Sequence, residues 1–106
     1  ELERDASQAA TLEAAALWDQ ASGIHAFLGD PKKAADCARQ AVFQTPDDFM
    51  LRRRLVESLL NNQEYSEAIS QLQWCLGRRP DDPGLQQQLE QANRQRLASQ
   101  TVIARQ

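Results

Sequence analysis

A tripeptide that recurs at a fixed distance constrains the fold of this chain more than any other feature. Pro46-Asp47-Asp48 is repeated 34 residues later as Pro80-Asp81-Asp82. Ala34 and Ala68 are separated by the same distance, and no insertion is needed to keep the two copies in register. A repeat of this length is typical of a supersecondary unit that stacks on copies of itself. The sequence therefore predicts two consecutive units of one design.

The residues between the repeated motifs predict that each unit is a pair of helices. Gly29-Asp30-Pro31 combines a helix stop, a cap and a helix start, and Asn61-Asn62-Gln63 takes this place in the second unit. No segment alternates with a period of two, so no strand is predicted. We expect an all-α fold with helices over about residues 3–28, 31–44, 48–61, 64–77 and 83–103.

Composition supports a single helical domain and argues against two classes of partner. The chain has 106 residues, of which 42% are hydrophobic and 25% charged, and its apolar share is rich in alanine, the best helix former. The net charge of −3 gives no overall basic field for nucleic acid. No segment approaches the roughly 20 apolar residues of a membrane span. We therefore expect neither nucleic-acid binding nor membrane insertion.

Both units resemble the tetratricopeptide repeat (TPR) family, whose unit is a helix–turn–helix with small residues on its second helix and a closing proline. The matching residues of the first unit are Trp18, Ala21, Ser22, Ala34, Ala38, Ala41 and Pro46. Those of the second unit are Leu55, Val56, Leu59, Tyr65, Ala68, Leu72, Cys75 and Pro80. Three positions depart from the pattern: Arg52 stands where the first unit has Trp18, His25 where the family prefers a tyrosine-like residue, and Ala38 where it has a larger residue.

The resemblance implies a right-handed superhelix of helical hairpins that forms one domain over residues 1–106. Its repeats are expected at 15–48 and 49–82, after an N-terminal helical extension over 1–14 and before a capping helix over 83–106. Small Ala34 and Ala68 are expected to let the two helices of each hairpin approach closely. The larger side chains expected to fill the space between hairpins are Trp18, Leu55, Leu59 and Leu72.

The reactive side chains do not form a pattern typical of catalysis. The single histidine, His25, lies in an apolar segment, where a core or interface position is expected. Cys37 and Cys75 have no neighbouring ligands in a metal-binding pattern, and their positions on successive second helices disfavour a disulfide. No glycine-rich phosphate loop or hydrolase motif occurs. We expect no enzymatic activity, no bound metal and no cofactor.

In the TPR family the first helices line a concave groove that holds extended peptides or partner helices. Carried onto this chain, the groove positions are Asp19, Gln20, Gly23, Arg53, Arg54, Glu57, Asn61, Gln87, Gln88 and Gln91. One subclass binds the C-terminal carboxylate of chaperone tails through two Lys–Asn pairs and an arginine. The matching positions here are Asp19, Gly23, Arg54, Gly84 and Gln88. Only Arg54 matches, so we expect no binding of that kind.

The run Arg52-Arg53-Arg54 allows two interpretations. Its charges can balance Asp47, Asp48 and Glu57, with Arg53 and Glu57 at the favourable i, i+4 spacing. Alternatively, the guanidinium groups form a patch that recognises a carboxylate or phosphate.

The expected function is a protein–protein interaction scaffold that binds a peptide or helix of a partner in its groove, without catalysis. The alternative is homo-oligomerisation, or assembly within a larger multi-domain protein. Apolar residues near both ends fit self-association or a junction with further repeats: Leu2, Ala6, Ala9, Leu12, Ala16, Val102 and Ile103. Because the chain begins at Glu1 and carries no targeting signal, we expect a fragment of a longer protein, and its cellular location stays open.

Overall fold

The computed structural model describes the backbone of residues 2–105 and the side chains of residues 7–100. The described backbone forms five helices and no strand, which confirms the predicted all-α class. The helices are α1 (Leu2–Phe27), α2 (Pro31–Gln44), α3 (Phe49–Asn61), α4 (Tyr65–Arg78) and α5 (Pro83–Arg105). Each predicted boundary lies within two residues of the observed one.

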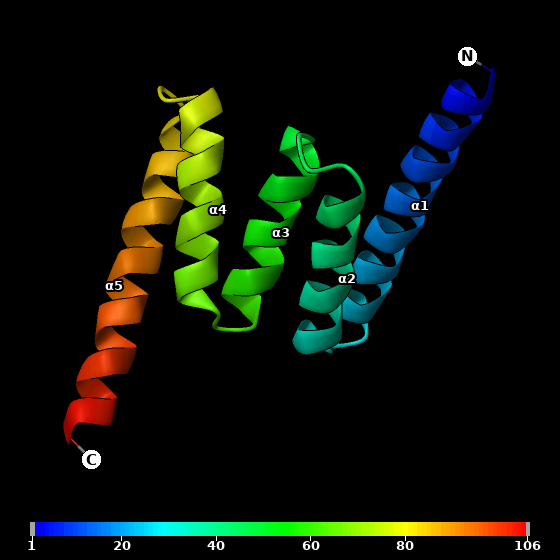
Figure 1. The fold of residues 1–106 in the computed structure, drawn as a ribbon. Helices are drawn as coiled ribbons and strands as arrows, with labels where there is room; N and C mark the ends of the chain where they lie inside the picture. The colour runs from blue at the N-terminus through cyan, green and yellow to red at the C-terminus, as the bar shows by residue number, and fades with distance from the viewer. Residues whose placement is uncertain (1, 106) are drawn as a thin grey trace.

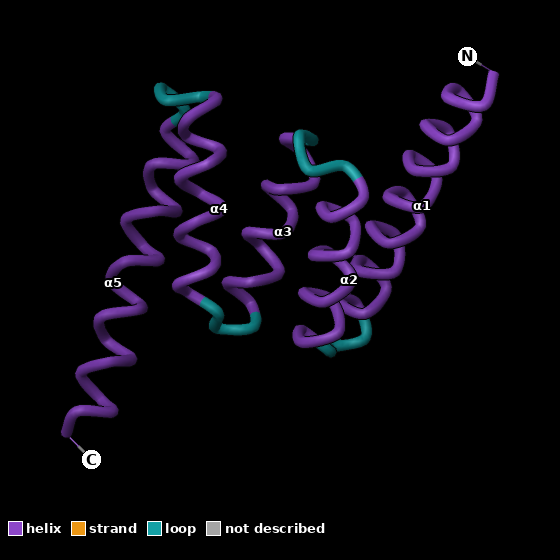
Figure 2. The backbone as a smooth tube through the Cα atoms, in the orientation of Figure 1, coloured by secondary structure: helices purple, strands orange, loops and turns teal. Residues whose placement is uncertain are grey.

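The helices lie side by side in chain order and run alternately up and down (Figure 1). Short turns connect them at alternating ends of the array (Figure 2). The array is elongated, with principal extents of 59 × 33 × 20 Å. α1 and α5 are the longest helices, and they project beyond their neighbours in opposite directions (Figure 1).

The repeated motifs act as turn and capping signals. Gly29 takes the left-handed backbone conformation with φ 78°, and the Asp30 carboxylate then accepts a hydrogen bond from the Lys33 amide at 3.1 Å. Gln63 takes the left-handed conformation in the second unit, with φ 60°. The last aspartate of each repeated tripeptide caps the next helix: Asp48 accepts from the amide of Leu51, and Asp82 from those of Gly84 and Leu85.

Two hydrophobic clusters stabilise the array, and α3 contributes to both. The first cluster consists of Ala15, Ala35, Ala38, Ala41, Val42, Leu51, Leu55, Leu59 and Ala68. The second consists of Val56, Ile69, Leu72, Cys75, Leu85 and Ala92. Leu60 packs against both clusters. The expected close approach within the first hairpin agrees with full burial of Ala34 and with a 2.7 Å hydrogen bond from the Ser22 hydroxyl to the Ala34 carbonyl.

One predicted core residue lies elsewhere. Leu55, Leu59 and Leu72 are at most 1% exposed, but Trp18 remains 39% exposed, so the prediction that it fills the core is wrong. The small residues Ala15 and Ser22 contact the α2 side of the hairpin instead. Such small side chains allow the two backbones to come close.

Candidate functional site: a polar groove along α1, α3 and α5

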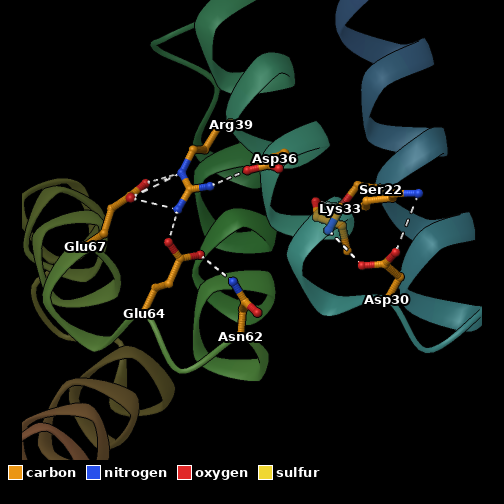
Figure 3. A network of polar contacts seen from close by, with 9 residues as sticks. Ser22, Asp30, Lys33, Asp36, Arg39, Asn62, Glu64 and Glu67 are labelled. Carbon is orange, nitrogen blue, oxygen red and sulfur yellow. Dashed lines mark hydrogen bonds and ion pairs between the residues drawn. The ribbon is translucent and has the colours of Figure 1, made fainter.

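A network of polar contacts links the two hairpins (Figure 3). Arg39 of α2 donates hydrogen bonds to Glu64 at 2.5 Å and Glu67 at 2.9 Å, around the start of α4, and to Asp36 at 2.8 Å. Asn62 donates to the second oxygen of Glu64 at 2.9 Å. The bond with Glu67 raises the pKa of Arg39, whereas the bonds from Asn62 and Arg39 lower the pKa of Glu64. The network ties α2 to α4 and so fixes the spacing of the hairpins.

Two adjoining cavities lie along the odd-numbered helices. The cavity between α1 and α3 has a volume of 340 Å³ and is lined by Asp19, Ser22, Gly23, Ala26, Arg54, Glu57, Ser58 and Asn61. The cavity between α3 and α5 has a volume of 390 Å³ and is lined by Glu57, Leu60, Asn61, Gln88, Gln91 and Gln95. Glu57 and Asn61 line both cavities, so the two adjoin across α3; together they are named here the polar groove.

Most of the residues assigned to the groove from the sequence line these cavities. They are Asp19, Gly23, Arg54, Glu57, Asn61, Gln88 and Gln91. Gln87 lies beside Gln91 in an adjoining hollow on α5. Gln20 is exposed on α1 and lines neither cavity. Arg53 also lines neither, and its guanidinium contacts Asp82 at 3.4 Å.

Sequence reasoning missed several lining residues: Ser22, Ala26, Ser58, Leu60 and Gln95. The repeat contains a signal for one of them, because Gln95 follows Asn61 by 34 residues. Both residues line the cavity between α3 and α5. The other residues have small or apolar side chains, which a search for charged and amide groups does not select.

Each arginine of the basic run has a partner within the molecule. Arg52 donates to the Pro46 carbonyl at 2.7 Å and to Gln71 at 3.1 Å, while Arg53 pairs with Asp82 and Arg54 with Asp19. The arginines do not pair with Asp47, Asp48 or Glu57, so the partners predicted from the sequence are wrong. Asp47 lies 3.6 Å from Arg78, and Asp48 caps α3.

The polar groove is consequently rich in amides and nearly neutral. Its cation, Arg54, is compensated by Asp19, which leaves the carboxylate of Glu57 as the excess charge. Asn61, Gln88, Gln91 and Gln95 supply side-chain amides. Each amide can both donate and accept hydrogen bonds, as a peptide backbone does. This surface can bind a polar chain through hydrogen bonds.

None of the side chains considered for catalysis or metal binding lines the polar groove. His25 is partly buried, and the described residues include no cluster of three or more His, Cys, Asp or Glu side chains able to hold a metal. Cys37 and Cys75 are buried free thiols, and burial raises the pKa of both. A raised pKa lowers the reactive thiolate fraction.

Comparisons with protein-family models, curated proteins and solved structures find no match to this chain. Among the described helices, none combines the length and apolar character needed to cross a membrane.

Proposed function

We propose that this chain is a TPR-like scaffold module that binds an extended peptide or helix of another protein in the polar groove, without catalysis. In this proposal the two 34-residue units are TPR-like hairpins and α5 is the capping helix. Support comes from the equivalent capping roles of Asp48 and Asp82 and from the fully buried alanines Ala34 and Ala68.

The observation that carries the proposal is that two cavities adjoin across α3 and are lined by residues of three helices. Glu57 and Asn61 of α3 line the cavities on both sides of that helix. A ligand that follows the groove can therefore contact α1, α3 and α5 in turn. The amides along it suit the alternating donors and acceptors of an extended backbone.

The pairing of Arg54 with Asp19 supports the exclusion of acidic tails as preferred ligands. A terminal carboxylate would have to compete with Asp19 for the guanidinium and would also meet Glu57. We therefore propose partners whose groove-binding segment is polar and carries little negative charge.

A random library of displayed 12-residue peptides, panned against the chain, tests the proposal. Peptides recovered from it should lose at least about tenfold in affinity with the double variant Asn61→Ala/Gln91→Ala, a loss equivalent to about 1.4 kcal/mol. The variant Gln73→Ala removes an exposed amide from α4 and is the matched control. Fluorescence anisotropy measures both affinities. Recovery of no peptide, or of peptides that bind both variants equally, would overturn the proposal.

A further inference from the structure

A small pocket adjoins the polar groove at the turn between α1 and α2. It has a volume of 260 Å³ and is lined by Ala26, Gly29, Pro31, Ala34, Ser58 and Asn61. Ala26, Ser58 and Asn61 also line the cavity between α1 and α3. The pocket, named here the turn pocket, therefore shares one side with the polar groove, and a ligand in that cavity lies next to it.

The wall that the turn pocket does not share with the groove is apolar. It consists of Gly29, Pro31 and Ala34, none of which carries a polar side chain. Ala34 is 1% exposed and belongs to the packed interior of the first hairpin. A Cβ atom added at Gly29 would meet no atom within 4 Å, so the missing side chain leaves open space at this wall. The small residues of the turn thus create the hollow.

Backbone polar groups around this wall are already bonded within the chain. The Gly29 amide donates to the Ala26 carbonyl at 3.1 Å. The Ala34 carbonyl accepts a hydrogen bond from the Ser22 hydroxyl at 2.7 Å. Pro31 has no amide hydrogen to donate. A charged or strongly polar group placed here would lose its hydration without compensation, so the wall favours an apolar group.

The volume of the turn pocket fits one ring. A cavity of about 150 Å³ is enough to hold benzene, whereas small-molecule sites have volumes of about 300–1,000 Å³. The 260 Å³ of the turn pocket lies between these values. An aromatic side chain supplies a large contact area with only two rotatable bonds, so its burial costs little conformational entropy. The hydroxyl of Ser58 and the amide of Asn61 lie on the side of the groove, where the backbone of a bound peptide would run.

We propose that the turn pocket is the specificity site of the polar groove and takes one phenylalanine or tyrosine side chain of the bound peptide. The proposal rests on the peptide binding proposed above and adds the residue that the peptide must carry. The amides of the groove bind the peptide backbone, which is the same for every sequence, whereas a pocket selects a side chain. The ligand class is therefore a polar segment that contains one aromatic residue.

Two capped amino acids test the turn pocket apart from any peptide. In isotope-labelled protein, N-acetyl-phenylalanine amide should shift the amide NMR signals of Gly29 and Ala34, whereas N-acetyl-alanine amide should not. Ala26→Leu places a larger side chain at an exposed position on the shared side and should weaken this binding at least about tenfold. Ala10→Leu makes the same change at an exposed alanine of α1 that lines neither the pocket nor the groove. This control should bind as the wild type does, and circular dichroism should show the same helicity for both variants.

Peptides selected with the polar groove provide the second test. Those that depend on Asn61 and Gln91 should share an aromatic residue, and its replacement by alanine should weaken binding at least about tenfold. Ala26→Leu should weaken the same peptides by a similar factor. Gln91→Ala should weaken the peptides but leave the capped phenylalanine unaffected, because Gln91 lines the cavity between α3 and α5 and not the turn pocket.

The outcomes separate the turn pocket from the groove. Selected peptides that depend on Asn61 and Gln91 but share no aromatic residue would overturn the turn pocket and leave the groove proposal standing. Capped phenylalanine that causes no shift at Gly29 and Ala34, or that binds equally well to Ala26→Leu, would do the same. Recovery of no peptide would overturn the groove proposal, and with it the role of the pocket in peptide selection, even if the capped phenylalanine binds.

Discussion

Arg39 binds three carboxylates at once, and its removal should show what the link between the hairpins contributes. Arg39→Ala removes the guanidinium that pairs with both Glu64 and Glu67. We expect the free energy of unfolding to fall by about 1–2 kcal/mol, more than for an ordinary surface pair, because Arg39 has several charge-assisted bonds and is only partly exposed. Urea denaturation measures the change. Arg94→Ala, which removes an exposed pair with Glu90, is the control and should cost under about 0.5 kcal/mol.

The same network makes stability depend on pH through Glu64. Its pKa lies below the ordinary value of 4.5, first because of Asn62 and then because of Arg39. The stabilisation is therefore fully present above pH 4.5 and is lost as the pH falls through the lowered pKa of the folded state. Urea unfolding between about pH 6 and pH 3 should show a smaller loss for Glu64→Gln than for the wild type. Parallel curves for the two proteins would contradict this assignment.

At the scale of elements, the turn between α1 and α2 depends on one glycine. Gly29 has φ 78°, a conformation that costs an L-residue about 1 kcal/mol. Gly29→Ala should destabilise the chain by about this amount. Gly77 lies within α4, and a methyl group added there would meet no atom within 4 Å. Gly77→Ala should therefore stabilise the chain by about 0.5–1 kcal/mol. In thermal unfolding, Gly29→Ala should lower the Tm and Gly77→Ala should raise it. A shift of both Tm values in the same direction would refute this account of the turn.

The helices could be predicted from the sequence because their signals are local. A cap such as Asp48 acts on an amide three residues away, so the tripeptide that contains it marks a helix start wherever it occurs. The buried face of α3 could also be predicted, because Leu55 and Leu59 occupy helical spacing within one repeat. The groove positions came from the resemblance to the TPR family, which implies that the first helices of the units line one groove.

The partners of the charged side chains could not be predicted, because they depend on packing between helices. Arg53 has Glu57 one turn away along α3, yet it pairs with Asp82, which is 29 residues away in the sequence. Arg54 likewise pairs with Asp19, which lies on α1. The exposure of Trp18 has a similar origin, since it depends on how closely α1 approaches α2. These contacts appear only when the helices are placed in three dimensions.

At the scale of the whole molecule, α3 is the element that joins the two halves. Its residues Leu55 and Leu59 belong to the first cluster, whereas Val56 belongs to the second. Packing otherwise runs mainly between helices that are neighbours in the sequence. In such a linear array, the units unfold together only when the interfaces between them contribute strongly to stability compared with the units themselves. One helix shared by both clusters should make the halves unfold together.

The two tryptophans allow a direct test of this coupling, since Trp18 lies on α1 and Trp74 on α4. Leu72 is fully buried in the second cluster, so Leu72→Ala should cost about 2–5 kcal/mol. In single-tryptophan proteins made with Trp74→Phe or Trp18→Phe, the urea midpoints of both fluorescence signals should shift together. Phe43→Ala, at a 76% exposed site, should shift neither midpoint appreciably. If Leu72→Ala moved only the Trp74 signal, the hairpins would be independent folding units, and the contacts of α3 and Arg39 between them would be too weak to make unfolding cooperative.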